Sequence, residues 1–330
     1  MKTAVLDAQN SAAAGERALL LRAFPSLKSG YEQIAEGYYH YGGDEHRIVE
    51  RPSDWSGYEE RLAAFAQVWA APCDVPRYLY FIENSRSIDM DDPEAGHAVA
   101  QRVAEAIGAD ETAVFRVDGY ESYAARFYQT DHHWNREGSY EGYQAIIRLL
   151  LGEEEPLQQP TGEVTVDAVF QGSYARQTHV LCADERFSFY VFDDVPRQTV
   201  LIDGKRGTYG RMAAYEKGKY PTDELRNHYA YCYGGDYGRV EFVTGTSGRG
   251  TLLVIAASYS NAIDSLIASH FDRTIYLDPR YYETEDGSPF DLAAFCEAEQ
   301  VDRLLYLGDI ALFRNDDAAT ADAAEGGAAE

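Results

Sequence analysis

The chain has 330 residues, 45% of them hydrophobic, and its 55 acidic residues against 29 basic residues give a formal net charge of −26. A protein this acidic repels phosphate backbones, so we expect no nucleic-acid partner. No apolar stretch approaches the length of a membrane span, and the four cysteines form no Cys-x-x-Cys pair, which argues against a zinc knuckle.

The two ends of the chain differ in composition from its middle. Residues 1–20 are rich in alanine and irregular, and residues 314–330 are acidic and of low complexity, so we expect both segments to be disordered. The first twenty residues contain no uninterrupted apolar core, and we therefore see no signal peptide in this chain.

Five short apolar runs between these ends are predicted to be β-strands. Each run is continuous rather than alternating, which is typical of strands that are buried on both faces of a parallel sheet. The runs are residues 77–82, 113–117, 251–257, 274–278 and 303–307.

Three segments between the strands have the 3.6-residue periodicity of amphipathic helices, namely residues 94–108, 260–271 and 288–300. The first is expected to end at Gly108, and the third to begin with Ser288 as its N-cap, followed by a proline at the first helical position. Alternation of strands and helices implies right-handed crossovers and a three-layer α/β core. The apolar faces consist of Val99, Val103, Ala106 and Ile107 in the first helix and of Ile263, Leu266, Ile267 and Phe271 in the second.

Residues 155–249 interrupt this alternation with strand-like runs and turns. We interpret them as a β-rich insertion carried by a discontinuous core, which then comprises residues 21–154 and 250–313. The expected fold class is α/β, with a three-layer, flavodoxin-like core and a mostly parallel sheet.

A serine stands where active-site residues often occur in α/β proteins. The apolar run 251–257 leads directly into Ser258, and helical periodicity follows at once. Ser258 would then lie at the carboxyl end of a parallel strand and at a helix N-terminus, whose free N–H groups can stabilise an oxyanion. The alternative is that Ser258 or Ser260 only caps the helix, because the segment lacks a Gly-x-Ser-x-Gly motif.

The run TDHHWN, residues 130–135, could supply the other members of a catalytic triad. Asp131 and His133 are two residues apart and point to the same side of an extended chain, so the carboxylate can orient an imidazole that faces Ser258. Two alternatives stay open at this point. The histidines could be structural members of a polar loop, or DHH could belong to a two-metal phosphoesterase, which needs further Asp and His ligands on earlier strand ends.

TDHHWN and the later segment SYSNAIDSLIASHFDRTIYLDPRYY, residues 258–282, together resemble the bacterial DHHW family, which is similar to the SGNH-like domains of alginate O-acetylation proteins. The resemblance covers roughly residues 75–310 and includes VFQGSYA (169–175) and YCYGGDYG (231–238). It implies an SGNH-like core.

The resemblance also implies roles for individual residues. Ser258 would be the nucleophile, His133 the base and Asp131 the group that orients it, because the family pattern is Asp-x-His-Trp. His132 then occupies the variable position, and we expect it to point away from the site. The family often has an acid or a glycine before the serine, whereas this chain has Ala257.

Four further residues are candidates for substrate binding. Arg280 leaves the strand after the serine helix and could bind a uronate or a phosphate, although a salt bridge with one of the many acids is the alternative. Gly235 and Asp236, in the GGD turn, could supply backbone donors to an oxyanion hole, or simply form a tight turn. The fourth candidate is Tyr259, next to the nucleophile.

These observations lead to three hypotheses. The first is a serine-dependent carbohydrate O-acetyltransferase or acetylesterase that acts on a cell-surface glycan, takes its acetyl group from a donor such as a membrane acyl carrier protein, and needs neither cofactor nor metal. The resemblance then suggests an extracytoplasmic or membrane-associated location. The second, motivated by Ala257 and the tyrosines of the insertion, is a non-catalytic glycan-binding or scaffolding protein. The third is the metal-dependent DHH phosphoesterase.

Overall fold

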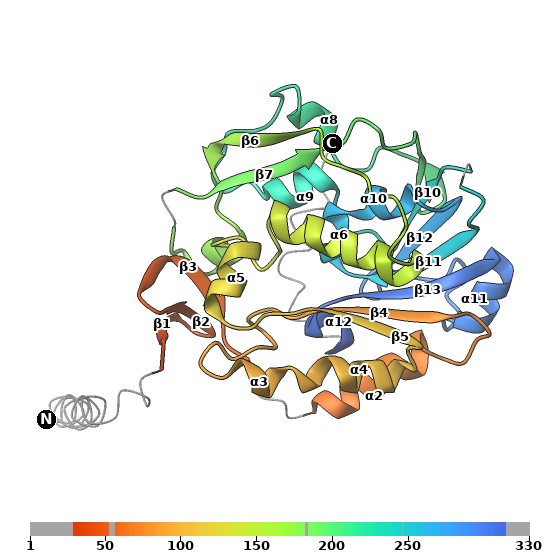
Figure 1. The fold of residues 1–330 in the computed structure, drawn as a ribbon, viewed down its shortest axis with the longest axis horizontal. Coiled ribbons are helices and arrows are strands. Elements are labelled where there is room, and N and C mark those ends of the chain that lie inside the picture. Colours follow the sequence, from red (N-terminus) through yellow and green to blue (C-terminus); the bar gives the residue numbers. More distant parts are fainter. Residues whose placement is uncertain (1–28, 53–56, 182–183, 246, 315–330) are drawn as a thin grey trace, which may run out of the picture.

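An eight-stranded sheet runs through the middle of the molecule (Figure 1). The structure is a computed structural model that describes residues 29–52, 57–181, 184–245 and 247–314. The expected disorder of residues 1–20 and of the tail after residue 314 therefore lies outside the described residues. The strands, in sheet order, are β5 (Glu111–Phe115), β4 (Arg77–Ile82), β13 (Val301–Gly308), β11 (Thr251–Ala256), β12 (Arg273–Leu277), β10 (Arg239–Val243), β8 (Thr199–Ile202) and β9 (Lys205–Arg206).

The five predicted apolar runs form the parallel part of this sheet. Strands β5, β4, β13, β11 and β12 pair in parallel in this order, and β11 lies between β13 and β12. The expected α/β class with a mostly parallel sheet is confirmed. Strand β5 is less buried than the other parallel strands, because it lies at the edge of the sheet.

Segment 155–249 contributes strands both to the central sheet and to a small sheet of its own. Its strands β8, β9 and β10 extend the central sheet in antiparallel fashion beyond β12. They thereby cover a strand edge that would otherwise expose unpaired backbone groups. The rest of the segment includes the antiparallel pair β6 (Gly162–Val169) and β7 (Arg186–Val191), which lies outside the central sheet (Figure 1).

Helices cover both faces of the sheet, because successive side chains of each buried strand point to opposite sides. In β11, Leu253 and Ile255 face one helical layer, whereas Leu252 and Val254 face the other. The first layer contains α2 (Tyr58–Trp69), α4 (Ala98–Ile107), α11 (Leu292–Glu299) and α12 (Ile310–Arg314); the second contains α5 (Tyr120–Arg126), α6 (Arg136–Leu151) and α10 (Asp264–Ala268).

The predicted helices form, but with different bounds and one different cap. Residues 260–271 are α-helical only in α10, Asp264–Ala268, after a 3₁₀ turn over Ser258–Ala262. Residues 94–108 become the short α3 (Pro93–Gly96) and then α4, which ends at Gly108 with a left-handed φ of 65°. Ala106 is exposed, and Ala100 joins the buried face instead. Helix α11 is capped by Asp291, which accepts a hydrogen bond from the Ala294 N–H at 3.0 Å, so the predicted cap at Ser288 is wrong.

The misplaced cap has a physical reason. Phe290, just before the true cap, stacks on Trp69 with 4.6 Å between the ring centroids. This apolar contact holds the preceding residues against α2, outside the helix, and a carboxylate is as good an N-cap as a serine hydroxyl.

Three smaller groups of elements were not predicted individually. Strands β1 (Tyr31–Ala35), β2 (Tyr38–Tyr41) and β3 (Asp44–Glu50) form an antiparallel sheet of their own. The short helices α7 (Ser173–Thr178), α8 (Met212–Tyr215) and α9 (His228–Tyr233) belong to segment 155–249, and a 3₁₀ turn, η2 (Ser258–Ala262), precedes α10. Helix α9 contacts η2, which brings segment 155–249 next to Ser258.

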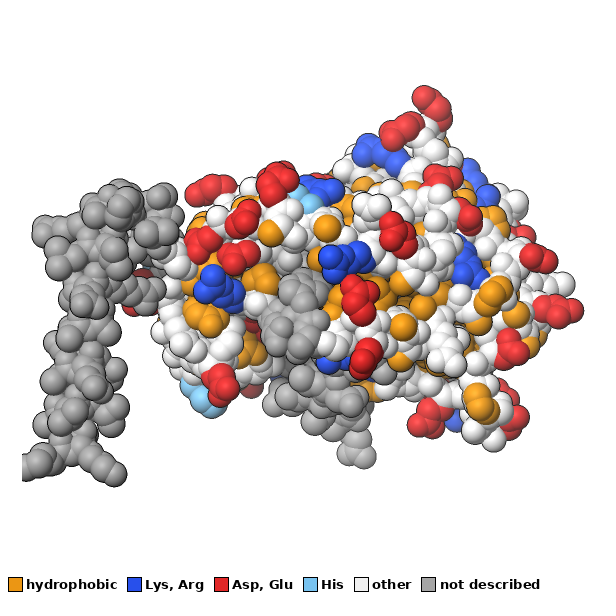
Figure 2. Space-filling model, turned by 90° about the horizontal axis from the view of Figure 1, so that it is seen from below, with side chains coloured by type: hydrophobic (Ala, Val, Ile, Leu, Met, Phe, Trp, Pro, Cys, Tyr) orange, Lys and Arg blue, Asp and Glu red, His pale blue; other side chains and the backbone are white. Residues whose placement is uncertain are grey.

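Figure 2 shows acidic side chains spread over one face of the molecule, with basic side chains interspersed, rather than gathered in a single patch. No helix in the described ranges is long and apolar enough to span a membrane. Cys73, Cys232 and Cys296 are free thiols, and Cys182 is outside the described residues.

Candidate active site

Ser258 lies where β11 leaves the sheet at its carboxyl end. It is the first residue of η2 and is half-buried. Ala257 occupies the N-cap position and no side chain caps the turn, so Ser258 is not a capping serine. Its Oγ instead faces the TDHHWN loop.

Two residues of the TDHHWN loop anchor it to the fold. Trp134 is fully buried against Phe115 and Tyr259, and Gly142 of α6 lies so close to the indole that a Cβ there would overlap it. Asn135 caps α6 by accepting a hydrogen bond from the Gly138 N–H at 3.0 Å. Trp134 and Asn135 therefore hold the loop in place at its C-terminal end. The side chains of Asp131, His132 and His133 take no part in this anchoring and contact other segments.

Asp131, His133 and Ser258 form a continuous hydrogen-bonded chain. His133 Nε2 lies 2.8 Å from Ser258 Oγ, and His133 Nδ1 lies 2.6 Å from Asp131 Oδ1. The His133 backbone N–H also donates to Asp131 Oδ1 at 3.0 Å. The carboxylate accepts the Nδ1 proton, which leaves Nε2 free to accept the serine hydroxyl proton.

The site environment keeps Asp131 ionised. Burial acts to raise the pKa of Asp131, but the neighbouring His133 and His132 and the hydrogen bond from His133 hold that pKa well below its usual value. The second oxygen, Oδ2, accepts a hydrogen bond from the Ser173 N–H at 2.7 Å. Gly172 packs directly on Asp131 and leaves no room for a Cβ, so residues 172–173 define the position of the carboxylate.

Tyr229 of α9 holds the other side of the imidazole. Its ring stacks on His133 with a centroid distance of 3.8 Å and an interplanar angle of 12°, and its hydroxyl donates to the Ser258 carbonyl at 3.1 Å. Tyr229 was missed by sequence reasoning. The only signal was its position just before the YCYGGDYG segment that carries the family resemblance.

His132 directs its Nδ1 to Ser173 and not to Ser258, although its ring stays next to the His133 ring and does not turn away from the site as a whole. Its ring lies 3.9 Å from the His133 ring, centroid to centroid, and its Nδ1 lies 2.8 Å from Ser173 Oγ. Burial, together with the neighbouring His133, lowers the pKa of His132 well below its usual value. A neutral His132 avoids charge repulsion with an imidazolium formed on His133.

The metal alternative requires more ligands than this site brings together. Asp131, His132 and His133 offer three ligand atoms within 4.8 Å of one another, which is a recognisable metal-site geometry. However, both nitrogens of His133 are engaged, one by Asp131 and one by Ser258. The acid directly after β4, Glu83, is engaged elsewhere, because its carboxylate is bound by His97, Arg116 and the Val117 N–H. The geometry favours the triad.

A buried polar network lies beneath the triad at the carboxyl ends of three parallel strands. Asn84, after β4, donates through Nδ2 to Asp309 Oδ2 at 2.7 Å and to the Tyr259 hydroxyl at 2.8 Å. The Tyr259 hydroxyl in turn donates to the His132 carbonyl. Tyr259 is only 2% exposed, so the expectation that it touches substrate is corrected: it supports the loop from below.

Arg280, Asp236 and Gly235 lie together on the rim of the site. Arg280 pairs with both oxygens of Asp278 and lies 3.1 Å from Asp236, so the salt-bridge alternative describes its contacts. Asp236 also accepts a hydrogen bond from Asn261, three residues after Ser258. The carboxylates of Asp278 and Asp236 therefore already neutralise the Arg280 guanidinium. Gly235 is half-buried and directly precedes Asp236.

Glu185, just before β7, holds the start of the TDHHWN loop. Its carboxyl accepts hydrogen bonds from the Thr130 N–H at 2.9 Å and the Thr130 hydroxyl at 2.6 Å, and from the Gln129 N–H. Burial raises the pKa of Glu185 from 4.5 to about 7, against the opposing effect of these hydrogen bonds and of Arg47.

We expect Glu185 to make the free energy of unfolding depend on pH. A raised folded-state pKa contributes stability that is fully present below pH 4.5 and is lost as the pH rises through about 7. The full shift corresponds to a loss on the order of 3 kcal/mol. Urea denaturation at pH 5 and pH 8 should show a smaller difference for Glu185→Gln than for the unmodified chain. Glu153→Gln, at an exposed position, is the control, and an unchanged pH dependence in Glu185→Gln would contradict the assignment.

Comparison of structures relates this fold to solved proteins. A DHHW family protein from Eubacterium siraeum matches with a TM-score of 0.61 and 17% identity, over 87% of this chain and 95% of that chain. Bacillus cereus PatB1 matches with a TM-score of 0.58 and 19% identity, over 82% and 95% of the two chains, and it has also been solved with a sulfonyl adduct. The O-acetyltransferase domain of Pseudomonas putida AlgJ matches over 89% and 95% of the two chains at 11% identity. Its TM-score is 0.41, and we draw no conclusion about function from this match.

The DHHW resemblance drawn from the sequence motifs is thus confirmed at the level of the fold. No protein-family model and no curated protein matches the sequence.

Proposed function

We propose that this protein is a serine-dependent acyl-transferring enzyme, a carbohydrate O-acetyltransferase or acetylesterase, with Ser258, His133 and Asp131 as its catalytic triad. The observation that carries the proposal is the hydrogen-bonded chain from Asp131 Oδ1 through His133 to Ser258 Oγ. A nucleophile, a base and an orienting carboxylate in this order are the arrangement that acyl transfer requires. Acetyl as the acyl group and a glycan as the acceptor rest on the DHHW resemblance.

The proposed reaction has two half-steps. His133 Nε2 takes the proton of Ser258 as Oγ attacks the carbonyl carbon of the acyl donor, and a tetrahedral oxyanion forms. His133 then returns this proton to the leaving group, which departs and leaves an ester on Ser258. In the second half-step a sugar hydroxyl or water gives its proton to His133 and attacks the ester, so that the acylated product leaves and the serine hydroxyl is restored.

The backbone around Ser258 supports this chemistry. Ser258 and Tyr259 are the first two residues of η2, where N–H groups have no acceptor within the turn, and we assign them as donors to the oxyanion. Tyr229, stacked on His133, would stabilise the transient imidazolium by a cation–π contact. Ser173 and Gly172 fix Asp131 from the opposite side.

A covalent probe tests the proposal directly. PatB1, which shares this fold, has been solved with a sulfonyl adduct, which suggests a sulfonyl fluoride as the reagent. We expect phenylmethylsulfonyl fluoride to add one sulfonyl group to the intact protein, and peptide mapping to place it on Ser258. The Ser258→Ala variant should stay unlabelled, and Ser247→Ala, which changes a serine far from the triad, should label as the unmodified chain does.

The non-catalytic alternative predicts a different result. A glycan-binding protein that has the fold of an enzyme but no activity has no activated serine. The sulfonyl label would then be absent, or it would be spread over several hydroxyls and would not change in Ser258→Ala. Either outcome would remove the enzymatic proposal.

A further inference from the structure

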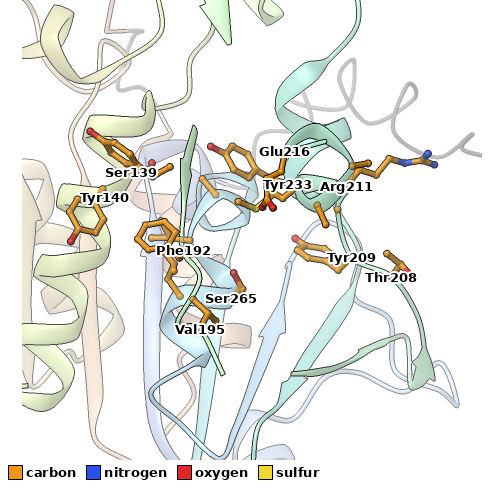
Figure 3. Close-up of a pocket in the computed structure, with 18 residues that line it drawn as sticks. Ser139, Tyr140, Phe192, Val195, Thr208, Tyr209, Arg211, Glu216, Tyr233 and Ser265 are labelled. Carbon is orange, nitrogen blue, oxygen red and sulfur yellow. The ribbon is translucent and has the colours of Figure 1, made fainter. Parts of the chain in front are cut away.

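A cleft of about 580 Å³ lies on the α6 side of the sheet (Figure 3), and its lining includes Ala262 of the 3₁₀ turn that begins at Ser258. Its floor includes Ala262 and Ile263, which belong to η2 and its end, and its walls come from α6, from the end of β7 and from the loop before α8. The volume is within the range of small-molecule binding sites. None of the three triad residues lines it, so the cleft is a feature separate from the triad.

The walls of the cleft are rich in aromatic rings. Five rings line it, and hydrogen bonds orient two of them: the Tyr209 hydroxyl contacts Asn261 and Asp264 at 3.1 and 3.0 Å, and the Tyr140 hydroxyl contacts the Gln158 carbonyl at 3.1 Å. Fixed aromatic faces suit a ligand with flat C–H faces, and a pyranose ring has such faces with hydroxyls around its edge. The five rings are Tyr140, Tyr190, Phe192, Tyr209 and Tyr233.

The charge of the cleft argues against an acidic ligand. Its lining contains one basic and one acidic side chain, Arg211 and Glu216, although the whole chain carries a net charge of −26. The Arg211 guanidinium lies over the Tyr231 ring, 4.5 Å from its centroid, and Figure 3 shows it pointing away from the aromatic walls. A polyuronate would meet repulsion from the protein as a whole and find no dedicated cation inside the cleft.

A short series of contacts connects the cleft to the triad. Tyr233, in the cleft wall, packs edge-on against Tyr229 with 5.0 Å between centroids, and Tyr229 stacks on His133. On the floor, Ala262 is four residues from Ser258 in the same 3₁₀ turn. Tyr229 and Tyr233 are both buried, so their side chains separate the cleft from the triad, and the cleft is a neighbouring site and not an open extension of the triad.

We infer that this cleft binds a neutral glycan, built from hexoses or N-acetylhexosamines, at a site beside the triad. Binding in the cleft does not depend on catalysis and can be measured without it.

The test uses the full chain with Ser258→Ala, so that no turnover disturbs binding. Isothermal titration with neutral hexose and N-acetylhexosamine hexasaccharides should give saturable binding, and an oligouronate of equal length should bind at least about tenfold more weakly. Phe192→Ala and Tyr190→Ala, each added to this background, should weaken neutral-glycan binding by about tenfold or more, because each removes an aromatic wall. Leu225→Ala, an exposed apolar residue outside the cleft, is the matched control.

A second readout separates this inference from the proposed function. With Ser258 intact, Phe192→Ala and Tyr190→Ala should hydrolyse nitrophenyl acetate within about threefold of the unmodified chain, since neither residue touches the triad. Circular dichroism of each variant checks that it folds. The inference is overturned if oligouronates bind as well as neutral glycans, if neutral glycans do not bind, or if the cleft variants that fold bind them unchanged. Loss of nitrophenyl acetate hydrolysis only in Ser258→Ala would leave the proposed function standing in each of those cases.

Discussion

Replacing Ser258 with alanine is expected to slow hydrolysis of nitrophenyl acetate by about two to four powers of ten. The substitution removes Oγ, the atom that lies 2.8 Å from His133 Nε2, and no other described hydroxyl contacts that nitrogen. The methyl group fits where the hydroxymethyl group was, so the fold should be preserved. The measurement is kcat/KM for the purified variant beside the unmodified chain.

Ser260→Ala is the matched control, because Ser260 lies in the same turn and is the alternative serine in the sequence. It is buried and has no hydrogen bond to His133 within the described part of the chain. We expect Ser260→Ala to retain the rate within about tenfold. Equal losses in the two variants would mean that the turn geometry, and not the Ser258 hydroxyl, determines the activity, and an unchanged rate in Ser258→Ala would refute the triad.

Replacing Asp131 with asparagine is expected to cost about three to four powers of ten in kcat. The carboxylate accepts the Nδ1–H of His133 at 2.6 Å, whereas an amide can present its NH₂ group there and favour the other tautomer of the imidazole. Nε2 would then carry the proton and could not accept the one on Ser258. The variant is almost isosteric, so circular dichroism should show a native fold.

The pH dependence gives this prediction a second readout. The pKa of Asp131 is held well below its usual value, so protonation of this carboxylate should not limit the rate of the unmodified enzyme in mild acid. In Asp131→Asn the rate should rise toward high pH, where hydroxide can take the Ser258 proton that the imidazole in the wrong tautomer cannot accept. Asp167→Asn, an exposed carboxylate on β6, is the control. A loss below tenfold, with an unchanged pH profile, would show that Asp131 serves only to hold the loop.

The sequence alone determined the parallel core and the outline of the site. Continuous apolar runs mark strands that are buried on both faces, because such strands need no polar side at all, and all five predicted runs lie in the parallel part of the sheet. The spacing of Asp131 and His133 is a local property as well, since residues two apart in an extended chain face the same way. This spacing and the family pattern Asp-x-His-Trp both selected His133 over His132.

Only the tertiary structure decided what surrounds these residues. His133 and Ser258 are 125 residues apart, and Tyr229, which stacks on the imidazole, comes from a segment read as an insertion. Local periodicity and turn residues do not encode such pairs, because they depend on which surfaces pack together across the whole chain. The same reason explains why Tyr259 is buried rather than at the substrate, why His132 faces Ser173, and why β8–β10 extend the central sheet.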